Sequence, residues 1–168
     1  MLEADERLRS RIRSNLDAHE RSVERNHELR PAAVAMSVVA DDGGDACFVI
    51  TRRVSTLRKH SGQWALPGGR IDEGEDAVGA ALRELEEEVG LELGREHVLG
   101  LLDDYPTRSG FRITPVVVWA GGPVSLRPNP AEVAEAHRPR IADLDAPGIP
   151  KLFDLGPVSY THLRAHET

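Results

Sequence analysis

The pattern of apolar and polar positions predicts several short strands. Five segments have strand-like runs or alternation, and clusters of Gly, Asp and Pro bound them. These segments are residues 32–40, 46–52, 64–66, 97–104 and 111–120. The sequence DDGGD between the first two is typical of a hairpin turn. Residues 132–138 fit a strand or a helix equally well by pattern alone.

Two segments have the helical period instead. In residues 76–89, the apolar side chains of Val78, Leu82, Leu85 and Val89 fall within about 60° of the helix circumference, and a glycine follows as a stop signal. Residues 3–29 form a charged helical pattern with a narrow apolar stripe, which an Arg-Pro pair ends. We expect this N-terminal helix to lie on the domain surface or on a partner subunit. Strands mixed with flanking helices predict an α/β fold.

Composition limits the class of protein. A chain of 168 residues with 40% hydrophobic and 29% charged residues predicts one compact soluble domain. The absence of a basic excess argues against stable binding to nucleic acid. No apolar run approaches 18 residues, which argues against a membrane span, and residues 1–30 are too charged for a signal peptide. The single cysteine, Cys47, excludes an internal disulfide, suits the cytoplasm, and is expected to be a buried small residue.

Negative charge is concentrated in one segment. Residues 72–88 hold eight acids and one arginine, so this segment alone equals the net charge of the whole chain, −7. On a helix, Glu84, Glu87 and Glu88 fall within about 100° of one another. Their mutual repulsion would become attraction around a divalent cation, and hard oxygen ligands favour Mg²⁺ or Mn²⁺ over Zn²⁺. The alternative is an acidic helix face exposed to solvent.

A family signature favours a metal site over a solvent-exposed acidic face. It consists of Gly, five residues, Glu, seven residues, Arg-Glu, an aliphatic residue, any residue, Glu-Glu, any residue, Gly and an aliphatic residue. The chain fills it with Gly69, Glu75, Arg83, Glu84, Leu85, Glu87, Glu88, Gly90 and Leu91. In this segment the chain resembles the Nudix hydrolases. The resemblance implies a Nudix-type α/β/α sandwich with a mixed sheet, a strand at 132–138 and a short helical turn at 141–144, in addition to the N-terminal helix.

The resemblance also implies an enzyme that hydrolyses a diphosphate bond in a nucleoside diphosphate derivative. Its Mg²⁺ or Mn²⁺ would be held by Glu84, Glu88 and Glu87, with Gly69 as a further metal position, and Arg83 would orient a carboxylate. The general base remains open between an unligated signature glutamate and one beyond the signature. The partner is a small nucleotide substrate, with no nucleic acid and no membrane, and the chain is a monomer or a homodimer.

A second motif bears on the substrate. The upstream sequence resembles that of the coenzyme A diphosphatases within the family, with matches at Thr51, Arg53, Arg58, Gly62, Pro67, Gly68 and Gly69. Val54 and Leu66 depart from the motif. The basic residues Arg52, Arg53, Arg58 and His60 are candidates for binding the 3′-phosphate of coenzyme A. The products would be 3′,5′-ADP and (acyl-)4′-phosphopantetheine.

Two alternatives and the chain ends complete the prediction. Pro106 is a weak sign of an ADP-ribose or nucleotide-sugar diphosphatase, and an inactive nucleotide-binding module is the non-enzyme alternative. We expect an N-terminal helical segment at 1–30 and a hydrolase domain at 31–158. Residues 159–168, SYTHLRAHET, resemble translated sequencing-adapter read-through, so we expect the natural sequence to differ after about residue 158.

Overall fold

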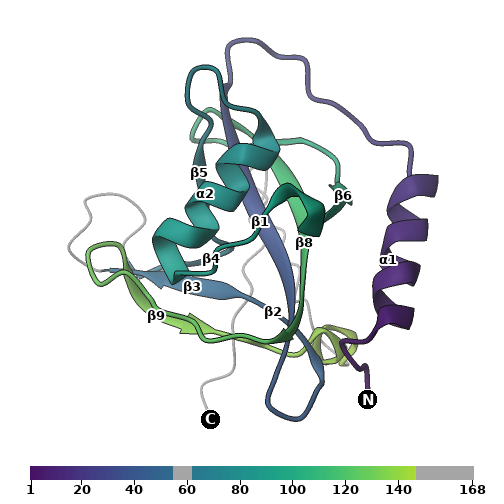
Figure 1. Cartoon of the computed structure of the whole chain (residues 1–168). Coiled ribbons are helices and arrows are strands. Elements are labelled where there is room, and N and C mark those ends of the chain that lie inside the picture. Colours follow the sequence, from purple (N-terminus) through teal and green to yellow (C-terminus); the bar gives the residue numbers. More distant parts are fainter. Residues whose placement is uncertain (55–61, 147–168) are drawn as a thin grey trace.

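The computed structural model describes residues 1–54 and 62–146, in which strands lie between two principal helices (Figure 1). The helices are α1 (Glu6–Ala18) and α2 (Ala77–Val89), with short 3₁₀ helices η1 (Arg95–His97) and η2 (Ile141–Asp145). The strands are β1 (Arg30–Ala40), β2 (Ala46–Phe48), β3 (Ile50–Arg53), β4 (Trp64–Ala65), β5 (Gly68–Arg70), β6 (Val98–Leu101), β7 (Tyr105–Pro106), β8 (Phe111–Pro123) and β9 (Val133–His137). Residues 159–168 lie outside the described part of the chain.

The strands form two sheets. The larger sheet has the order β2-β1-β8-β6, with β5 on β1 and β7 on β8, and the smaller has the order β4-β3-β9. β1 and β8 run parallel, whereas the pairs that β1 forms with β2 and β5 are antiparallel. The larger sheet is therefore mixed, as the sequence predicted. The two sheets separate where the chain passes from β2 to β3 and from β4 to β5.

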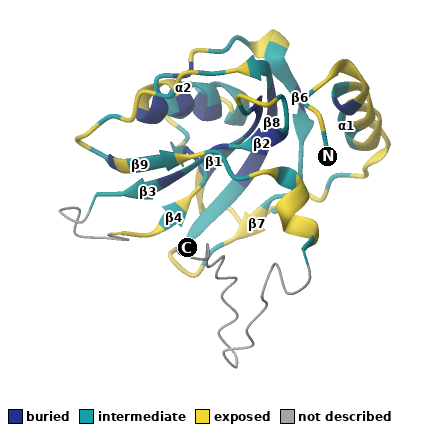
Figure 2. Cartoon of the chain, turned by 90° about the horizontal axis from the view of Figure 1, so that it is seen from below, coloured by how far each residue is buried: buried dark blue, intermediate teal, exposed yellow. Residues whose placement is uncertain are grey.

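Alternate residues of β1 and β8 face two different helices. Toward α2, residues such as Val39 and Val116 pack against the fully buried Leu85. Toward α1, residues such as Val38 and Val117 pack against Leu8. A sheet that buries both faces under helices gives the predicted α/β/α sandwich, and Figure 2 shows the deepest burial along its central strands and the inner face of α2.

The helix α2 has the predicted limits and recognisable ends. Asp76 is its N-cap, and its side chain accepts a hydrogen bond from the amide of Gly79 at 2.7 Å. Gly90 ends it in the left-handed conformation, with φ 68°, which glycine adopts without a steric penalty. The strand at 132–138 and the helical turn near 141 are also confirmed. Cys47 is fully buried, as expected.

Two predictions about element limits were wrong. The helix predicted over 3–29 ends at Ala18. Beyond it, Arg21 donates to Asp104 and Asp103 accepts from the amide of Ser22, and these tertiary contacts stand in place of continued helical bonding. The strand predicted over 46–52 is divided at the fully buried Val49, so that its two halves join different sheets.

No helix among the described residues is both long and apolar enough to cross a membrane.

Candidate active site

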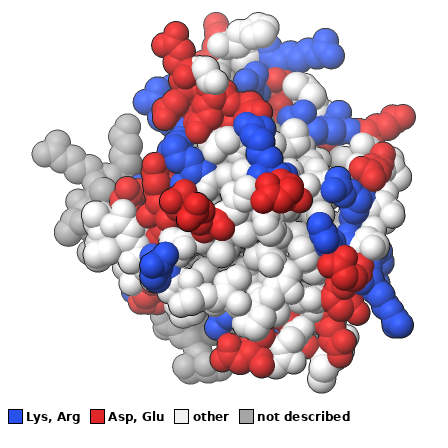
Figure 3. All heavy atoms as spheres, viewed as in Figure 1, with Lys and Arg blue, Asp and Glu red and all other residues white. Residues whose placement is uncertain are grey.

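The signature segment forms β5, a short loop and α2, which pack closely together. A Cβ atom on Gly69 would overlap the carboxylate of Glu84, and one on Gly68 would overlap the carbonyl of Ala33 in β1. Only glycine therefore lets β5 fit between β1 and the carboxylates of α2 without displacement. Figure 3 shows acidic side chains gathered over α2 and the loop before it, with basic side chains among them.

Arg83 holds the acidic side chains of this segment in place. Its Nε and Nη2 donate to the two carboxylate oxygens of Glu75 at 3.0 and 3.1 Å. Its Nη1 donates to Glu84 Oε1 at 2.9 Å and to Glu87 Oε2 at 3.3 Å. Arg83 therefore contacts the adjacent Glu84 through one bond, whereas its two-bond pair is with Glu75. The bonds from Arg83 also hold the pKa of Glu75 below its usual range, so Glu75 serves as an ionised anchor.

Glu88 is the most deeply buried of the three predicted metal ligands. It is 4% exposed, and its carboxylate accepts hydrogen bonds from Thr51 Oγ1 at 3.4 Å and from the amide of Gly68 at 3.3 Å. Burial raises its pKa to about 7. Thr51 belongs to the smaller sheet and Gly68 to the larger one, so the carboxylate lies where the two sheets separate. We call this line of separation the seam.

The side chains of the other two predicted ligands differ in how far they are exposed to solvent. The side chain of Glu84 is 13% exposed, and burial raises its pKa. The side chain of Glu87 is 52% exposed and bonded to Arg83. Glu86 is exposed, as predicted. The acidic face is thus a pair of desolvated carboxylates, Glu84 and Glu88, flanked by a solvated one.

A further carboxylate, Glu132, belongs to this group and was not predicted. After burial, the negative charge of Glu132 is among the causes of the raised pKa of both Glu84 and Glu88. Backbone bonds position it: the carbonyl of Glu88 accepts from the amide of Asn129, and the carbonyl of Glu132 accepts from the amide of Val54. Nothing in the local sequence marks Glu132, because its proximity depends on a tertiary contact between the β8–β9 connection and the end of α2.

The predicted substrate-binding arginines lie in different surroundings. The positive charge of Arg53 lies near enough to Glu88 to lower the pKa of that carboxyl, against the larger effect of burial. The Nε of Arg53 is buried without a hydrogen-bond partner among the described residues. Arg52 instead forms an ion pair with Glu135 and lies 6.0 Å from the ring centroid of Trp64. Arg58 and His60 lie outside the described residues.

The donor set has the chemistry that a divalent cation requires. Glu84 and Glu88 offer desolvated carboxylate oxygens, and Gly69, which has no side chain, lets the Glu84 carboxylate lie directly against the backbone of β5. In the described part of the chain, however, no three acidic, histidine or cysteine side chains already converge with metal-ligand spacing. A cation would compete with Arg83 for the oxygens of Glu84 and Glu87. The residues fit Mg²⁺ or Mn²⁺ by ligand type.

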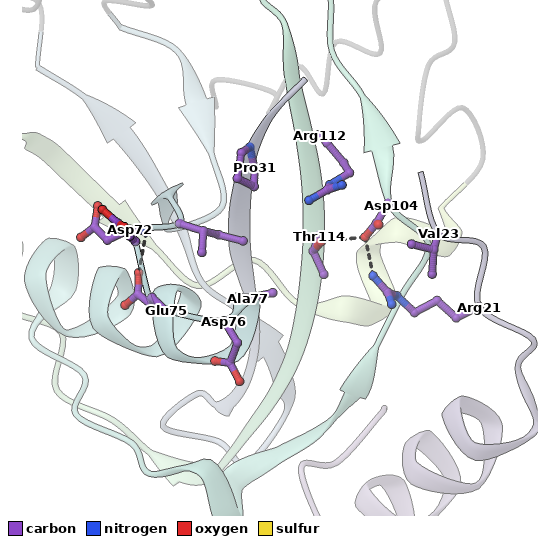
Figure 4. Close-up of a pocket in the computed structure, with 12 residues that line it drawn as sticks. Arg21, Val23, Pro31, Asp72, Glu75, Asp76, Ala77, Asp104, Arg112 and Thr114 are labelled. Atoms are coloured by element: carbon purple, nitrogen blue, oxygen red, sulfur yellow. Dashed lines mark hydrogen bonds and ion pairs between the residues drawn. The ribbon is translucent and has the colours of Figure 1, made fainter. Parts of the chain in front are cut away.

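A cavity of about 500 Å³ lies beside the start of α2 (Figure 4). One wall is the acidic loop, and the other is formed by β8 and the segment that follows α1. Asp104 accepts hydrogen bonds from Arg21 and from Thr114 Oγ1, and Arg112 donates to the carbonyl of Glu24. These arginines therefore anchor the segment after α1 to the sheet.

Comparison with known proteins identifies the family. The sequence pattern of the NUDIX domain matches residues 29–156. The chain belongs to the Nudix family. The MutT protein from Methanosarcina mazei superimposes with a TM-score of 0.54 at 20% identity, over 79% of this chain and 88% of that one. This similarity confirms the predicted Nudix fold.

Two curated relatives are nearer in sequence. A Nudix hydrolase of Pectobacterium atrosepticum, NudL, is 39% identical over 110 residues, which cover 65% of this chain and 56% of the relative. The chloroplastic Nudix hydrolase 22 of Arabidopsis thaliana is 38% identical over 121 residues, 70% of this chain and 38% of the relative. The chain spans about half the length, or less, of these relatives.

Proposed function

We propose that this Nudix protein hydrolyses the diphosphate bond of a nucleoside diphosphate derivative with the help of Mg²⁺ or Mn²⁺. The observation that carries the proposal is the pair of desolvated carboxylates, Glu84 and Glu88, set against the side-chain-free backbone of Gly68 and Gly69. Carboxylates that are buried at an energetic cost, rather than exposed, are typical of functional sites. An inactive binding module would have no need of this pair.

The roles of the residues follow from their surroundings. Glu84, Glu88 and Glu87, with Gly69, would hold the cation, which when bound neutralises charge on the phosphoryl oxygens and acidifies a water molecule. Arg83 restrains Glu84 and Glu87 so that their oxygens stay together. The charge of Glu132 acts on both buried carboxylates and Glu132 is outside the signature, which makes it our candidate for the general base.

Coenzyme A or its thioesters are the substrates that we propose. The upstream motif supports them, since Thr51 supports the Glu88 carboxylate and Arg53 lies beside the same site with a buried Nε that lacks a partner among the described residues. A phosphate group would satisfy that Nε through a charge-assisted hydrogen bond. Pro106, the sign of an ADP-ribose substrate, lies on the exposed strand β7, and nothing in its position favours that alternative.

The experiment is a substrate panel in Mg²⁺ with products resolved by mass. We expect coenzyme A and acyl-coenzyme A to yield 3′,5′-ADP, and ADP-ribose to react more slowly. Glu88→Gln should lower kcat at least about 100-fold, because it removes a charge from a preorganised site. Glu86→Gln, an exposed change on the same helix, should retain activity. Equal rates for these two variants would contradict the assignment, and a preference for ADP-ribose would contradict the substrate.

A further inference from the structure

A groove of about 960 Å³ lies on the opposite side of the sheets from α2. Its walls are α1 and η2, and its floor comes from both sheets. The floor side chains are large and apolar, namely Met36, Val38, Phe48, Ile50, Trp64 and Leu66. Five of these six are only partly buried, because they face the groove rather than the core. The volume lies at the upper end of the range for small-molecule sites.

The groove and the buried carboxylates share the seam. On the α2 side, Glu88 contacts Thr51 of one sheet and Gly68 of the other. On the α1 side, Trp64 and Leu66 line the groove, and the carbonyl of Ala65 between them lies 3.3 Å from the same Thr51 hydroxyl, whose single proton it shares with Glu88. Leu66 is two residues from Gly68, and two extended residues span at most about 7 Å. The end of the groove is therefore close to the reaction site.

The side chains that line the groove indicate which kind of ligand it can bind. Polar side chains are confined to the helical walls, where Asn15, His19, Arg140 and Asp143 lie, and the sheet floor offers none among the described residues. The charge of Arg140 is already balanced by Asp41 and Asp45. Among the described residues that line the groove, a phosphate would find no unbalanced cation, and a nucleobase would find no polar side chains on the floor for its edge. An uncharged chain with an apolar end suits an apolar floor and a polar rim.

We propose that this groove binds the acyl-thioester arm of the substrate while the diphosphate lies at Glu84 and Glu88. The assignment rests on the proposed function and adds to it a site for the group that distinguishes one acyl thioester from another. Each CH₂ group buried in such a groove raises affinity about fourfold. Longer chains should therefore bind better until the groove is full.

The test uses ligands that contain no nucleotide or diphosphate. Titration calorimetry of the metal-free protein with S-acyl-pantetheines of two to twelve acyl carbons should give affinity that rises roughly fourfold per CH₂ and then levels off. Because no hydrolysis is measured, the result stands apart from the proposed reaction. Diphosphatase activity without chain-length dependence of binding would overturn the groove assignment alone, and binding without diphosphatase activity would overturn the reaction alone.

Two variants and a control locate the binding. Leu144→Glu places a charge at the rim, on a residue that is already 37% exposed, and should weaken dodecanoyl-pantetheine binding at least about tenfold. Ile50→Trp fills the floor and should shorten the longest chain that still gains affinity. Val23→Glu makes the same kind of change at a residue that is 49% exposed and outside the groove, and should leave binding unaltered.

Other occupants would produce different results. If a second copy of the chain fills the groove, Leu144→Glu will convert a dimer into a monomer. If the chain that follows Ala146 fills it, Leu144→Glu will lower the free energy of unfolding while acyl-pantetheines fail to bind. Either result, or equal binding by Leu144→Glu and Val23→Glu, would overturn the proposal.

Discussion

At the scale of single residues, the site combines carboxylates that water reaches with carboxylates that it does not. Glu87 is half exposed, whereas Glu88 on the next position is buried beneath Thr51 and Gly68. Burial raises the pKa of Glu88 to about 7, so near neutral pH a cation competes with a proton for this side chain. The negative charge of Glu132, which lies outside the signature, also raises the pKa of Glu88.

The first prediction therefore concerns Glu132. If it is the general base, Glu132→Gln should lower kcat about 10²- to 10⁴-fold and change the acidic limb of the pH–kcat profile. Glu96→Gln alters a carboxylate whose side chain is 77% exposed and should leave both unchanged. Measurement of kcat from pH 5 to 9 for both variants and the parent tests this role of Glu132. A Glu132→Gln variant with the kcat and pH profile of the parent would remove Glu132 from the mechanism.

At the scale of elements, the site depends on how closely β5 approaches α2. Gly69→Ala should displace the Glu84 carboxylate, because the added methyl group would occupy its position. The atoms in the way are the end of a flexible side chain, which can move aside, so we expect activity to fall while the free energy of unfolding changes little. Gly122→Ala in β8 is the matched control, since its Cβ would meet no atom within 4 Å, and its effect should stay within about 0.5 kcal/mol. Similar hydrolysis rates for the two variants would contradict this account of the packing.

At the scale of the whole molecule, the buried carboxylate links stability to pH. The ordinary pKa of a glutamate is 4.5 and that of Glu88 in the folded protein is about 7, so the folded state binds the proton more tightly. Its contribution to stability is fully present below pH 4.5 and is lost as pH rises through 7. Carboxyls with a lowered pKa, such as Asp76, are ionised in both states above about pH 5.5 and add nothing to this change.

The expected result concerns the metal-free protein. Between pH 5.5 and 8, the free energy of unfolding of the parent chain should fall by about 2 kcal/mol more than that of Glu88→Gln. Urea unfolding in the presence of EDTA measures this difference. Addition of Mg²⁺ or Mn²⁺ at pH 8 should restore stability to the parent but not to the variant, because a ligand that binds only the folded state stabilises it. Parallel pH profiles for the two proteins would show that Glu88 is not the group responsible.

The part of the site that lies on α2 could be predicted from sequence because its geometry is local. Residues three and four apart on a helix always lie on neighbouring positions, so the grouping of Glu84, Glu87 and Glu88 follows from spacing alone. The helix end follows from Gly90, because glycine adopts the left-handed conformation without a steric penalty. The resemblance to the Nudix signature then supplied the fold and the general reaction that we propose.

Tertiary structure decided everything that depends on distant segments meeting. The parallel pairing of β1 with β8, the division of one apolar run at Val49, and the arrival of Glu132 beside α2 all join residues far apart in sequence. Desolvation has the same origin, because the burial of Glu88 requires both sheets and no local pattern records it. The apolar groove exists only because two sheets and two helices enclose it. Spacing determined which side chains share a helix face, and long-range packing determined what surrounds them.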